Sequence, residues 1–279
     1  MDRVRCITAD GINLIGFKYE DDNNEWNIII PGVDGNIITN EFICYMGEYL
    51  SNNGKTFLLA HNRGSFQIIS SNSLDSGVPG ITIGSVFEKF DDSIYDIDAW
   101  LEFAILNGAK KINLLGHSHG CNKLINYLFK VHKYDDYINK IILLSPLDLR
   151  TRMVKRRELD KLWQKANEAS IREDLGNFVC CGFFYKDSNS FFDMMKNEAI
   201  DNFPMMNEIN NDFSIFNSIS KDKYIVYGSD ETKYINLLNM KRQYLSEWVK
   251  SIDVIEGANH IYQGKEQELA KYVLRIVGK

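Results

Sequence analysis

The sequence predicts an α/β fold in which helices cover both faces of a mostly parallel sheet. Short runs of β-branched and aliphatic residues alternate with longer segments of helical periodicity along most of the chain. The runs are apolar almost without interruption, as is typical of strands buried on both faces of a parallel sheet. One of these runs leads directly into Gly116-His117-Ser118-His119-Gly120, and a helical pattern follows.

The elements can be placed in chain order. The first two strands, 4–8 and 13–19, are predicted to form a hairpin because Asp10-Gly11 between them supplies a tight turn. Six further buried strands are expected, at residues 27–30, 56–60, 111–115, 140–144, 224–227 and 252–255. Helices are expected between them, among others at 94–105 and 124–129, where apolar residues recur on one face.

The alternation stops between residues 150 and 221, where no strand is evident. A chain of 279 residues is long enough for one α/β domain with an insertion. We therefore expect residues 1–149 and 222–279 to form the core, and residues 150–221 to form a helical cap after the sixth strand. Such an insertion would lie over the carboxyl ends of the strands, where open α/β sheets bind ligands.

This segment is rich in aromatic and methionine side chains, which include Phe183, Phe184, Phe191 and Phe192. They are expected either to line an apolar substrate pocket or to form the small core of the cap itself. The segment also begins with a basic run, Arg150, Arg152, Lys155, Arg156 and Arg157. A solvated helix face is the simpler interpretation of this run, and binding of a carboxylate or phosphate is the alternative.

Composition excludes several classes of function. A net charge of −6 argues against a general nucleic-acid surface. No apolar run approaches the ~20 residues of a membrane span, and the N-terminal residues lack the apolar core of a signal peptide. The five cysteines are odd in number and contain no C-x-x-C pair, which is typical of reduced thiols in a cytoplasmic protein. We expect a cytoplasmic protein without metal or other cofactor, and the sequence leaves a homodimer open.

Residues 116–120 form a G-x-S-x-G motif between a predicted strand and a predicted helix. The glycines at both ends leave room for a sharp turn, which lifts the side chain of Ser118 clear of the sheet. The following helix directs its N-terminus at any negative charge that develops nearby. The motif therefore predicts Ser118 as a catalytic nucleophile.

A serine hydroxyl needs a base, and in this arrangement the chain order is serine, then carboxylate, then histidine. His260 follows the last predicted strand and is the one histidine in the second half of the chain, so it is the expected base. The carboxylate that orients it is expected at the end of strand 224–227. Asp230 is preferred there over Glu231, and Asp148, one strand earlier, is a third candidate.

Two main-chain N–H groups are expected to bind the oxyanion formed during acyl transfer. One belongs to His119, directly after the serine. The other is expected from Val33 in Pro31-Gly32-Val33-Asp34-Gly35-Asn36, where two glycines let the backbone approach a substrate carbonyl. The side chains of His117 and His119 flank the serine, but the turn sets their directions and neither is the expected base.

These motifs resemble those of α/β-hydrolases over nearly the whole chain. Residues 31–36 are similar to the His-Gly-Phe-x-Gly-Asn loop of cinnamoyl and feruloyl esterases, with Pro31 in place of the histidine. Residues 84–90 and 96–99 also resemble that group and the related siderophore-esterase-like group. The acid segment departs from the usual Gly-x-x-Asp, because Asp230 lies only two residues after Gly228.

The motifs and the resemblance together imply a serine hydrolase. It would cleave an ester, thioester or amide of a small organic molecule through an acyl-enzyme. A thioesterase or acyltransferase of a biosynthetic pathway would use the same residues, and a non-catalytic binding protein could keep the same pocket.

Overall fold

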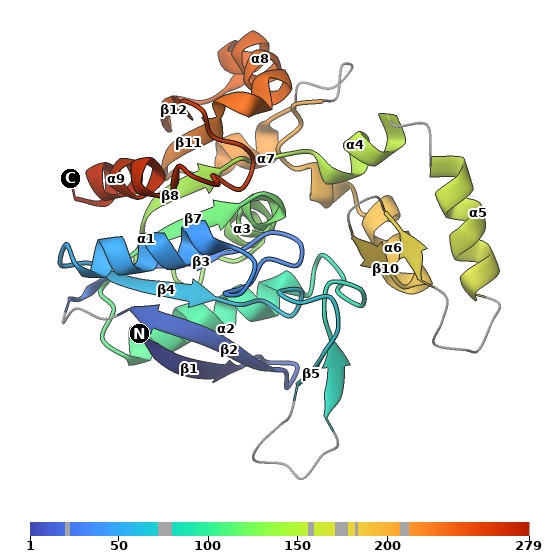
Figure 1. Ribbon diagram of the computed structural model, residues 1–279, viewed down its shortest axis with the longest axis horizontal. Coiled ribbons are helices and arrows are strands. Elements are labelled where there is room, and N and C mark those ends of the chain that lie inside the picture. The colour runs from blue at the N-terminus through green and yellow to red at the C-terminus, as the bar shows by residue number, and fades with distance from the viewer. Residues whose placement is uncertain are drawn as a thin grey trace.

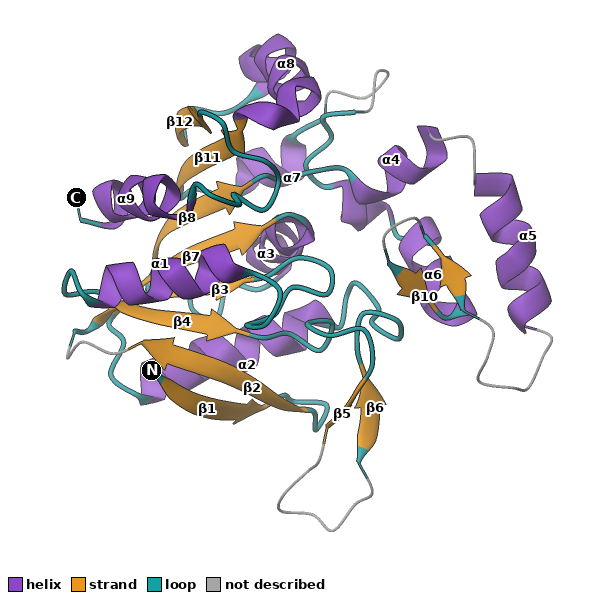
Figure 2. Ribbon diagram, viewed as in Figure 1, coloured by secondary structure: helices purple, strands orange, loops and turns teal. Residues whose placement is uncertain are grey.

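The computed structural model describes residues 1–19, 23–71, 80–155, 159–170, 178–181, 184–206 and 212–278. Its centre is an eight-stranded sheet in which helices cover both faces, as Figures 1 and 2 show. The predicted fold class is therefore confirmed.

The eight strands of the sheet correspond to the eight predicted apolar runs. They are β1 (Asp2–Ile7), β2 (Asn13–Tyr19), β3 (Glu25–Ile30), β4 (Thr56–Ala60), β7 (Lys111–His117), β8 (Ile138–Leu144), β11 (Asp222–Gly228) and β12 (Val249–Ile255). Their spatial order is β1-β2-β4-β3-β7-β8-β11-β12. β2 pairs antiparallel with both β1 and β4, whereas all pairs from β4 to β12 are parallel. The parallel strands therefore end at one common edge.

Two hydrophobic clusters hold the helices to the sheet. On one face, α1 (Glu41–Ser51) and α9 (Glu266–Val277) pack on side chains such as Ile29, Leu115 and Val226. On the other face, α2 (Ser93–Leu106), α3 (His119–Lys130), α7 (Ser214–Ser218) and α8 (Thr232–Lys241) pack on residues such as Ile28 and Leu114. Side chains of successive residues in one strand thus point to opposite faces of the sheet, as the pleat of a strand requires.

The chain between β8 and β11 differs in part from the predicted helical segment. It contains α4 (Leu149–Lys155), α5 (Leu159–Ser170), α6 (Ser188–Lys196) and a 3₁₀ turn, η1 (Glu198–Asp201). It also contains two short antiparallel strands, β9 (Val179–Cys180) and β10 (Tyr185–Lys186), which sequence periodicity cannot detect at this length. Figure 1 shows these elements at the end of the sheet toward which the parallel strands point.

A second small hairpin, β5 (Ile69–Ser71) with β6 (Ile81–Ile83), extends from the loop after β4 and was not predicted. Two further 3₁₀ turns, η2 (Ser229–Glu231) and η3 (Arg242–Tyr244), precede and follow α8. All five cysteines lie in the described residues, and none forms a disulfide. Within the described ranges, every helix is too short or too polar to cross a bilayer.

Candidate active site

Ser118 is the single residue between the end of β7 and the start of α3. Its backbone has φ 54° and ψ −125°, a strained conformation that a nucleophile elbow imposes on its serine. The neighbouring glycine is required by close packing, since a Cβ on Gly120 would collide with the main-chain carbonyl oxygens of Ile30 and Pro31. The predicted sharp turn between a buried strand and a helix is therefore present at Ser118.

His260 lies in the loop between β12 and α9, and its imidazole faces the serine. Nε2 of His260 lies 3.0 Å from Oγ of Ser118, and Nδ1 lies 2.7 Å from Oε1 of Glu231. A carboxylate only accepts hydrogen bonds, so Nδ1 carries the proton and Nε2 is free to accept one from the serine hydroxyl. The structure thus brings the predicted serine and histidine together in the tautomer that a general base needs.

The carboxylate beside His260 belongs to Glu231, which corrects the preference for Asp230. The η2 turn after β11 directs the Glu231 side chain back toward the strand end, where Oε2 accepts the N–H of Gly228 at 3.0 Å. The side chain of Asp230 instead is exposed at the rim, and its main-chain N–H donates to the carbonyl of Ala258. One signal in the sequence could have found this, because Glu231 has the Gly-x-x-acid spacing from Gly228 that Asp230 lacks.

Glu231 is held by more than the imidazole. The hydroxyl of Ser145, at the end of β8, donates to Oε2 at 2.5 Å, and the hydroxyls of Ser145 and Tyr262 are 2.8 Å apart. Burial opposes ionisation of Glu231, but the hydrogen bonds from His260, Ser145 and Gly228 outweigh it and lower its pKa below the ordinary value. The carboxylate is therefore ionised at neutral pH and fixed in orientation.

His117 supports the loop that carries His260. Its Nε2 lies 2.9 Å from the main-chain carbonyl oxygen of His260, which can only accept, so Nε2 carries the proton. Burial lowers the pKa of His117 to about 3, and its buried Nδ1 has no hydrogen-bond partner among the described residues. His117 is therefore a neutral donor to the His260 main chain, consistent with the expectation that it is not the base.

The two predicted oxyanion donors flank Ser118. A Cβ on Gly32 would lie 2.9 Å from Cβ of Ser118, so the loop that contains Val33 passes directly against the serine. His119 is the first residue of α3, where main-chain N–H groups have no partner within the helix. No described residue accepts a hydrogen bond from the main-chain N–H of Val33 or of His119. Neither N–H group therefore has a hydrogen-bond partner within the described residues.

Asp148, the third candidate acid, lies elsewhere. Its two carboxylate oxygens accept the main-chain N–H groups of Met205, at 2.9 Å, and Met206, at 2.5 Å. Burial and the nearby Asp201 carboxylate raise the pKa of Asp148 to about 7. Asp148 therefore ties the end of β8 to the segment before α7, and Glu231 takes the place beside His260.

A cavity of about 570 Å³ opens onto the serine. The predicted residues Val33, Ser118, Asp230 and His260 line it, together with Glu231, Tyr234 and Ile261. Two cationic side chains also line it, those of Arg152 from α4 and Lys233 from α8. Arg152 belongs to the predicted basic run, of which Arg156 and Arg157 lie outside the described residues. A smaller cavity, of about 170 Å³, lies between β2 and the β5–β6 hairpin.

The aromatic side chains between β8 and β11 pack mainly on one another. Phe184 and Phe191 are fully buried in a cluster with Leu162, Met194 and other residues of that segment. Neither contributes to the cavity at Ser118, and Phe183 lies outside the described residues. Phe184 and Phe191 thus fit the expectation of a small core within this segment, whereas Phe203, Phe213 and Phe216 belong to the cluster that packs on the central sheet.

The arrangement suits acyl transfer. A serine hydroxyl aligned with an unprotonated imidazole nitrogen can attack a carbonyl, and two N–H groups beside it can bind the resulting oxyanion. The described residues contain no group of three or more His, Cys, Asp or Glu side chains arranged to hold a metal ion.

No protein-family model matches this sequence, and no significant match exists among curated proteins. Solved structures do match. Est1E from Butyrivibrio proteoclasticus is 16% identical, covers 100% of both chains and has a TM-score of 0.60. The siderophore hydrolase EstB from Aspergillus fumigatus is 14% identical, covers 98% of this chain and 96% of its own, and has a TM-score of 0.63.

A third match is the Pyrococcus furiosus esterase Pf2001, which is 15% identical over 99% of this chain and 89% of its own, with a TM-score of 0.55. At such identities the similarity establishes the fold, which is that of the α/β-hydrolases.

Proposed function

We propose that this protein is a serine hydrolase that cleaves carboxylic esters of small organic molecules through an acyl-enzyme. The observation that carries the proposal is the continuous hydrogen-bonded chain from Ser118 through His260 to Glu231. In this proposal the three residues form the catalytic triad, with Glu231 as its acid. The cavity of about 570 Å³ at Ser118 would hold the substrate.

In the acylation step, Oγ of Ser118 attacks the ester carbonyl while Nε2 of His260 takes the hydroxyl proton. The carbonyl π electrons move to the oxygen, and the N–H groups of Val33 and His119 bind the resulting oxyanion. Glu231 stabilises the imidazolium. As the tetrahedral intermediate collapses, the C–O bond to the alcohol breaks, and His260 returns the proton to the departing alcohol.

Deacylation repeats these steps with water. Nε2 of His260 takes a proton from the water as its oxygen attacks the acyl carbon, and the same N–H groups bind the second oxyanion. Collapse of that intermediate breaks the bond to Oγ, releases the carboxylic acid and returns the proton to Ser118. His260 is partly exposed, with 36% of its side-chain surface accessible, which leaves a path for this water.

The comparisons support the reaction class. Pf2001 is an esterase and EstB is a siderophore hydrolase, and both have the fold of this chain, as does Est1E. One structure of Est1E holds ferulic acid. An aromatic acyl group is therefore a reasonable first choice for the substrate panel.

We further propose that residues 150–221 form a cap beside the active site. Arg152 is the one residue of this segment among the described residues that line the cavity. Arg152 and Lys233 add cationic groups to a cavity that also contains Tyr234 and Ile261, so the substrate panel should include esters with a carboxylate elsewhere in the molecule.

The proposal is tested by labelling with a fluorophosphonate probe and by turnover of p-nitrophenyl and feruloyl esters. Wild-type protein is expected to incorporate one probe and to hydrolyse esters, while Ser118→Ala does neither. Comparison with acyl-CoA thioesters separates an esterase from a thioesterase or acyltransferase. A wild-type protein that is neither labelled nor active on any ester would instead indicate a binding protein.

A further inference from the structure

The loop after β4, residues 61–65, supports the loop that carries Val33. The two loops follow neighbouring parallel strands, β4 and β3, and lie side by side. Three hydrogen bonds join them. The N–H of Ile37 donates to Nε2 of His61 at 3.0 Å, and the N–H of Asp34 donates to the carbonyl of Gly64 at 3.2 Å. The third is made by a side chain, that of Asn62.

Asn62 is buried, and each of its amide atoms has a defined partner. Its Oδ1 accepts from Nζ of Lys123 at 3.1 Å and from the N–H of Gly64 at 2.9 Å. Because an ammonium group only donates, the amide oxygen must face Lys123, and the amide nitrogen must face the other way. There Nδ2 donates to the main-chain carbonyl of Pro31 at 3.3 Å.

The other end of this chain of contacts is a buried cation. Lys123 is fully buried on α3, and its ammonium group also pairs with Oε1 of Glu88 at 2.5 Å. A buried ammonium group needs acceptors, so Lys123 fixes the position of the Asn62 oxygen strongly. The helix that carries Lys123 is also the helix that begins at His119.

The contacts therefore connect the two main-chain N–H groups proposed to bind the oxyanion. His119 is held by α3, and Val33 lies two residues after Pro31, whose carbonyl Asn62 holds. Pro31 has no main-chain N–H. A main-chain hydrogen bond at this residue can therefore form only through its carbonyl oxygen. The link from Lys123 to Asn62 to Pro31 thus helps to set the distance between the two donors, together with the hydrogen bond from Asp34 to Gly64.

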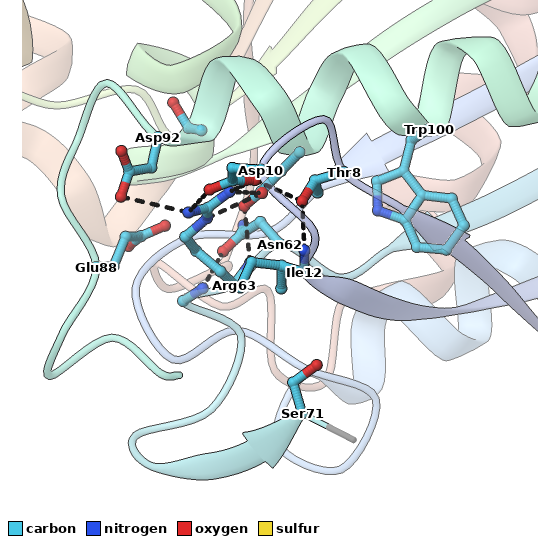
Figure 3. A network of polar contacts seen from close by, with 12 residues as sticks. Thr8, Asp10, Ile12, Asn62, Arg63, Ser71, Glu88, Asp92 and Trp100 are labelled. Carbon is cyan, nitrogen blue, oxygen red and sulfur yellow. Dashed lines mark hydrogen bonds and ion pairs between the residues drawn. The ribbon is translucent and has the colours of Figure 1, made fainter. Parts of the chain in front are cut away.

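The 61–65 loop is anchored independently of that link. Figure 3 shows Arg63 between Asp10 and Asp92, and its guanidinium also binds the buried Asp96 at 2.8 Å. The indole N–H of Trp100 donates to the carbonyl of His61 at 2.8 Å. The loop therefore keeps its place when only the contact from Asn62 to Pro31 is removed.

We propose that Asn62 is a positioning residue, which holds the Pro31–Val33 main chain at the distance from His119 that binding of an oxyanion requires. The inference rests on the proposed esterase function, because an oxyanion forms only in acyl transfer. Misplacement of a reacting or stabilising group by about 1 Å can cost about 100-fold in rate. Ground-state binding of the substrate does not depend on the oxyanion and should be little changed.

The test is Asn62→Asp, which keeps an acceptor for Lys123 and Gly64 but removes the donor to Pro31. Turnover of a p-nitrophenyl ester is expected to lose about 10- to 100-fold in kcat, with KM within about threefold. A phenyl-substituted trifluoromethyl ketone, which forms a hemiketal oxyanion with a serine, should lose affinity by a similar factor. The product carboxylic acid, which forms no such oxyanion, should bind as before.

The matched control is Asn122→Asp, an equally buried change one residue from Lys123. Asn122 donates to Asn202 and, among the described residues, makes no hydrogen bond with the loop of Val33. Both its kcat and its affinity for the trifluoromethyl ketone should stay within about threefold of wild type. Circular dichroism and thermal unfolding establish that each variant is folded, and Asn62→Ala replaces Asn62→Asp if the latter does not fold.

Wild-type turnover is measured first, so that failure of the proposed esterase function is distinguished from failure of this inference. With an active wild type, a folded Asn62→Asp that keeps full kcat and full affinity for the trifluoromethyl ketone overturns the inference. A loss of kcat without a loss of that affinity also overturns it. So does a failure of both Asn62 variants to fold, since Asn62 would then be a structural residue.

Discussion

Oε1 of Glu231 lies 2.7 Å from Nδ1 of His260, whereas the neighbouring carboxylate of Asp230 is exposed at the rim of the same cavity. Two adjacent acids thus have different surroundings. Glu231 is buried and accepts three hydrogen bonds, from His260, Ser145 and Gly228. Of the two carboxylates, that of Glu231 is therefore the one placed to orient the imidazole of His260.

The pair provides a sharp mutational test. Glu231→Gln keeps the size of the side chain but removes its charge, so the imidazolium loses its stabilisation and ester turnover should fall about 10²- to 10⁴-fold. Asp230→Asn should change turnover less than about threefold. The measurement is kcat/KM on a p-nitrophenyl ester. The reverse order of effects would return the acid role to Asp230.

Ser145 provides a weaker support for the same carboxylate. Ser145→Ala removes a hydrogen bond to a charged, buried group, which typically contributes about 1.5–3 kcal/mol. We expect kcat to fall about tenfold while KM changes little, because Glu231 is held less firmly. Thermal unfolding of the variant should report a loss of the same order in stability. Unchanged kcat and stability would show that the hydroxyl contributes nothing to the site.

The raised pKa of Asp148 should make the stability of the folded protein depend on pH. Its pKa is raised to about 7 in the folded protein, so between about pH 4 and pH 7 the folded state holds a proton that the unfolded state has lost. Its contribution to stability is therefore full below about pH 4 and declines as the pH rises to about 7. The difference in unfolding free energy between wild type and Asp148→Asn should shrink by up to a few kcal/mol across that range.

Chemical denaturation at several pH values measures this difference. Ester turnover by Asp148→Asn at a fixed pH should stay within about threefold of wild type, since Asp148 contacts Met205 and Met206 rather than His260. A difference in stability that does not vary with pH would contradict the assigned pKa. A loss of turnover as large as that of Glu231→Gln would make Asp148 the acid.

Substrate selectivity is expected to depend on Tyr234 rather than on the buried aromatic residues of the segment between β8 and β11. Tyr234 lines the cavity, so Tyr234→Ala should change the preference among acyl chain lengths by about tenfold. Phe191 is fully buried in the cluster of that segment, so Phe191→Ala should cost about 3–5 kcal/mol in stability. A panel of p-nitrophenyl esters, with thermal unfolding, separates the two effects. A shift in selectivity for Phe191→Ala with full stability would reverse this assignment.

Much of the fold could be predicted from the sequence because the inner strands of the sheet, such as β4 and β7, are continuous runs of buried apolar residues. The edge strand β1 is more exposed, and the Asp10-Gly11 turn indicated its hairpin with β2. All eight predicted strands lie in the central sheet. The pairs β5–β6 and β9–β10 were missed, since strands of two or three residues with serine, lysine and cysteine give no periodic signal. Their formation depends on tertiary contacts.

Part of the candidate site could likewise be predicted from the sequence, and part could not. Ser118 and His260 could be predicted because each stands in a loop whose place follows from the order of strands and helices. The choice between Asp230 and Glu231 depends on the direction of a side chain in a 3₁₀ turn, for which the spacing of Glu231 from Gly228 is the one signal in the sequence. The link from Lys123 to Asn62 to Pro31 joins residues far apart in sequence, and only the folded chain brings them together.

The central claim, that Ser118 is acylated and then released by water, is tested most directly by trapping the intermediate. Wild-type protein is mixed with an activated ester, quenched in acid within milliseconds and analysed by intact-mass and peptide mass spectrometry. The account predicts one acyl group on the peptide that contains Ser118, formed together with a burst of released alcohol and lost on longer incubation. Steady hydrolysis by Ser118→Ala at the wild-type rate, or an acyl group on a different residue, would contradict it.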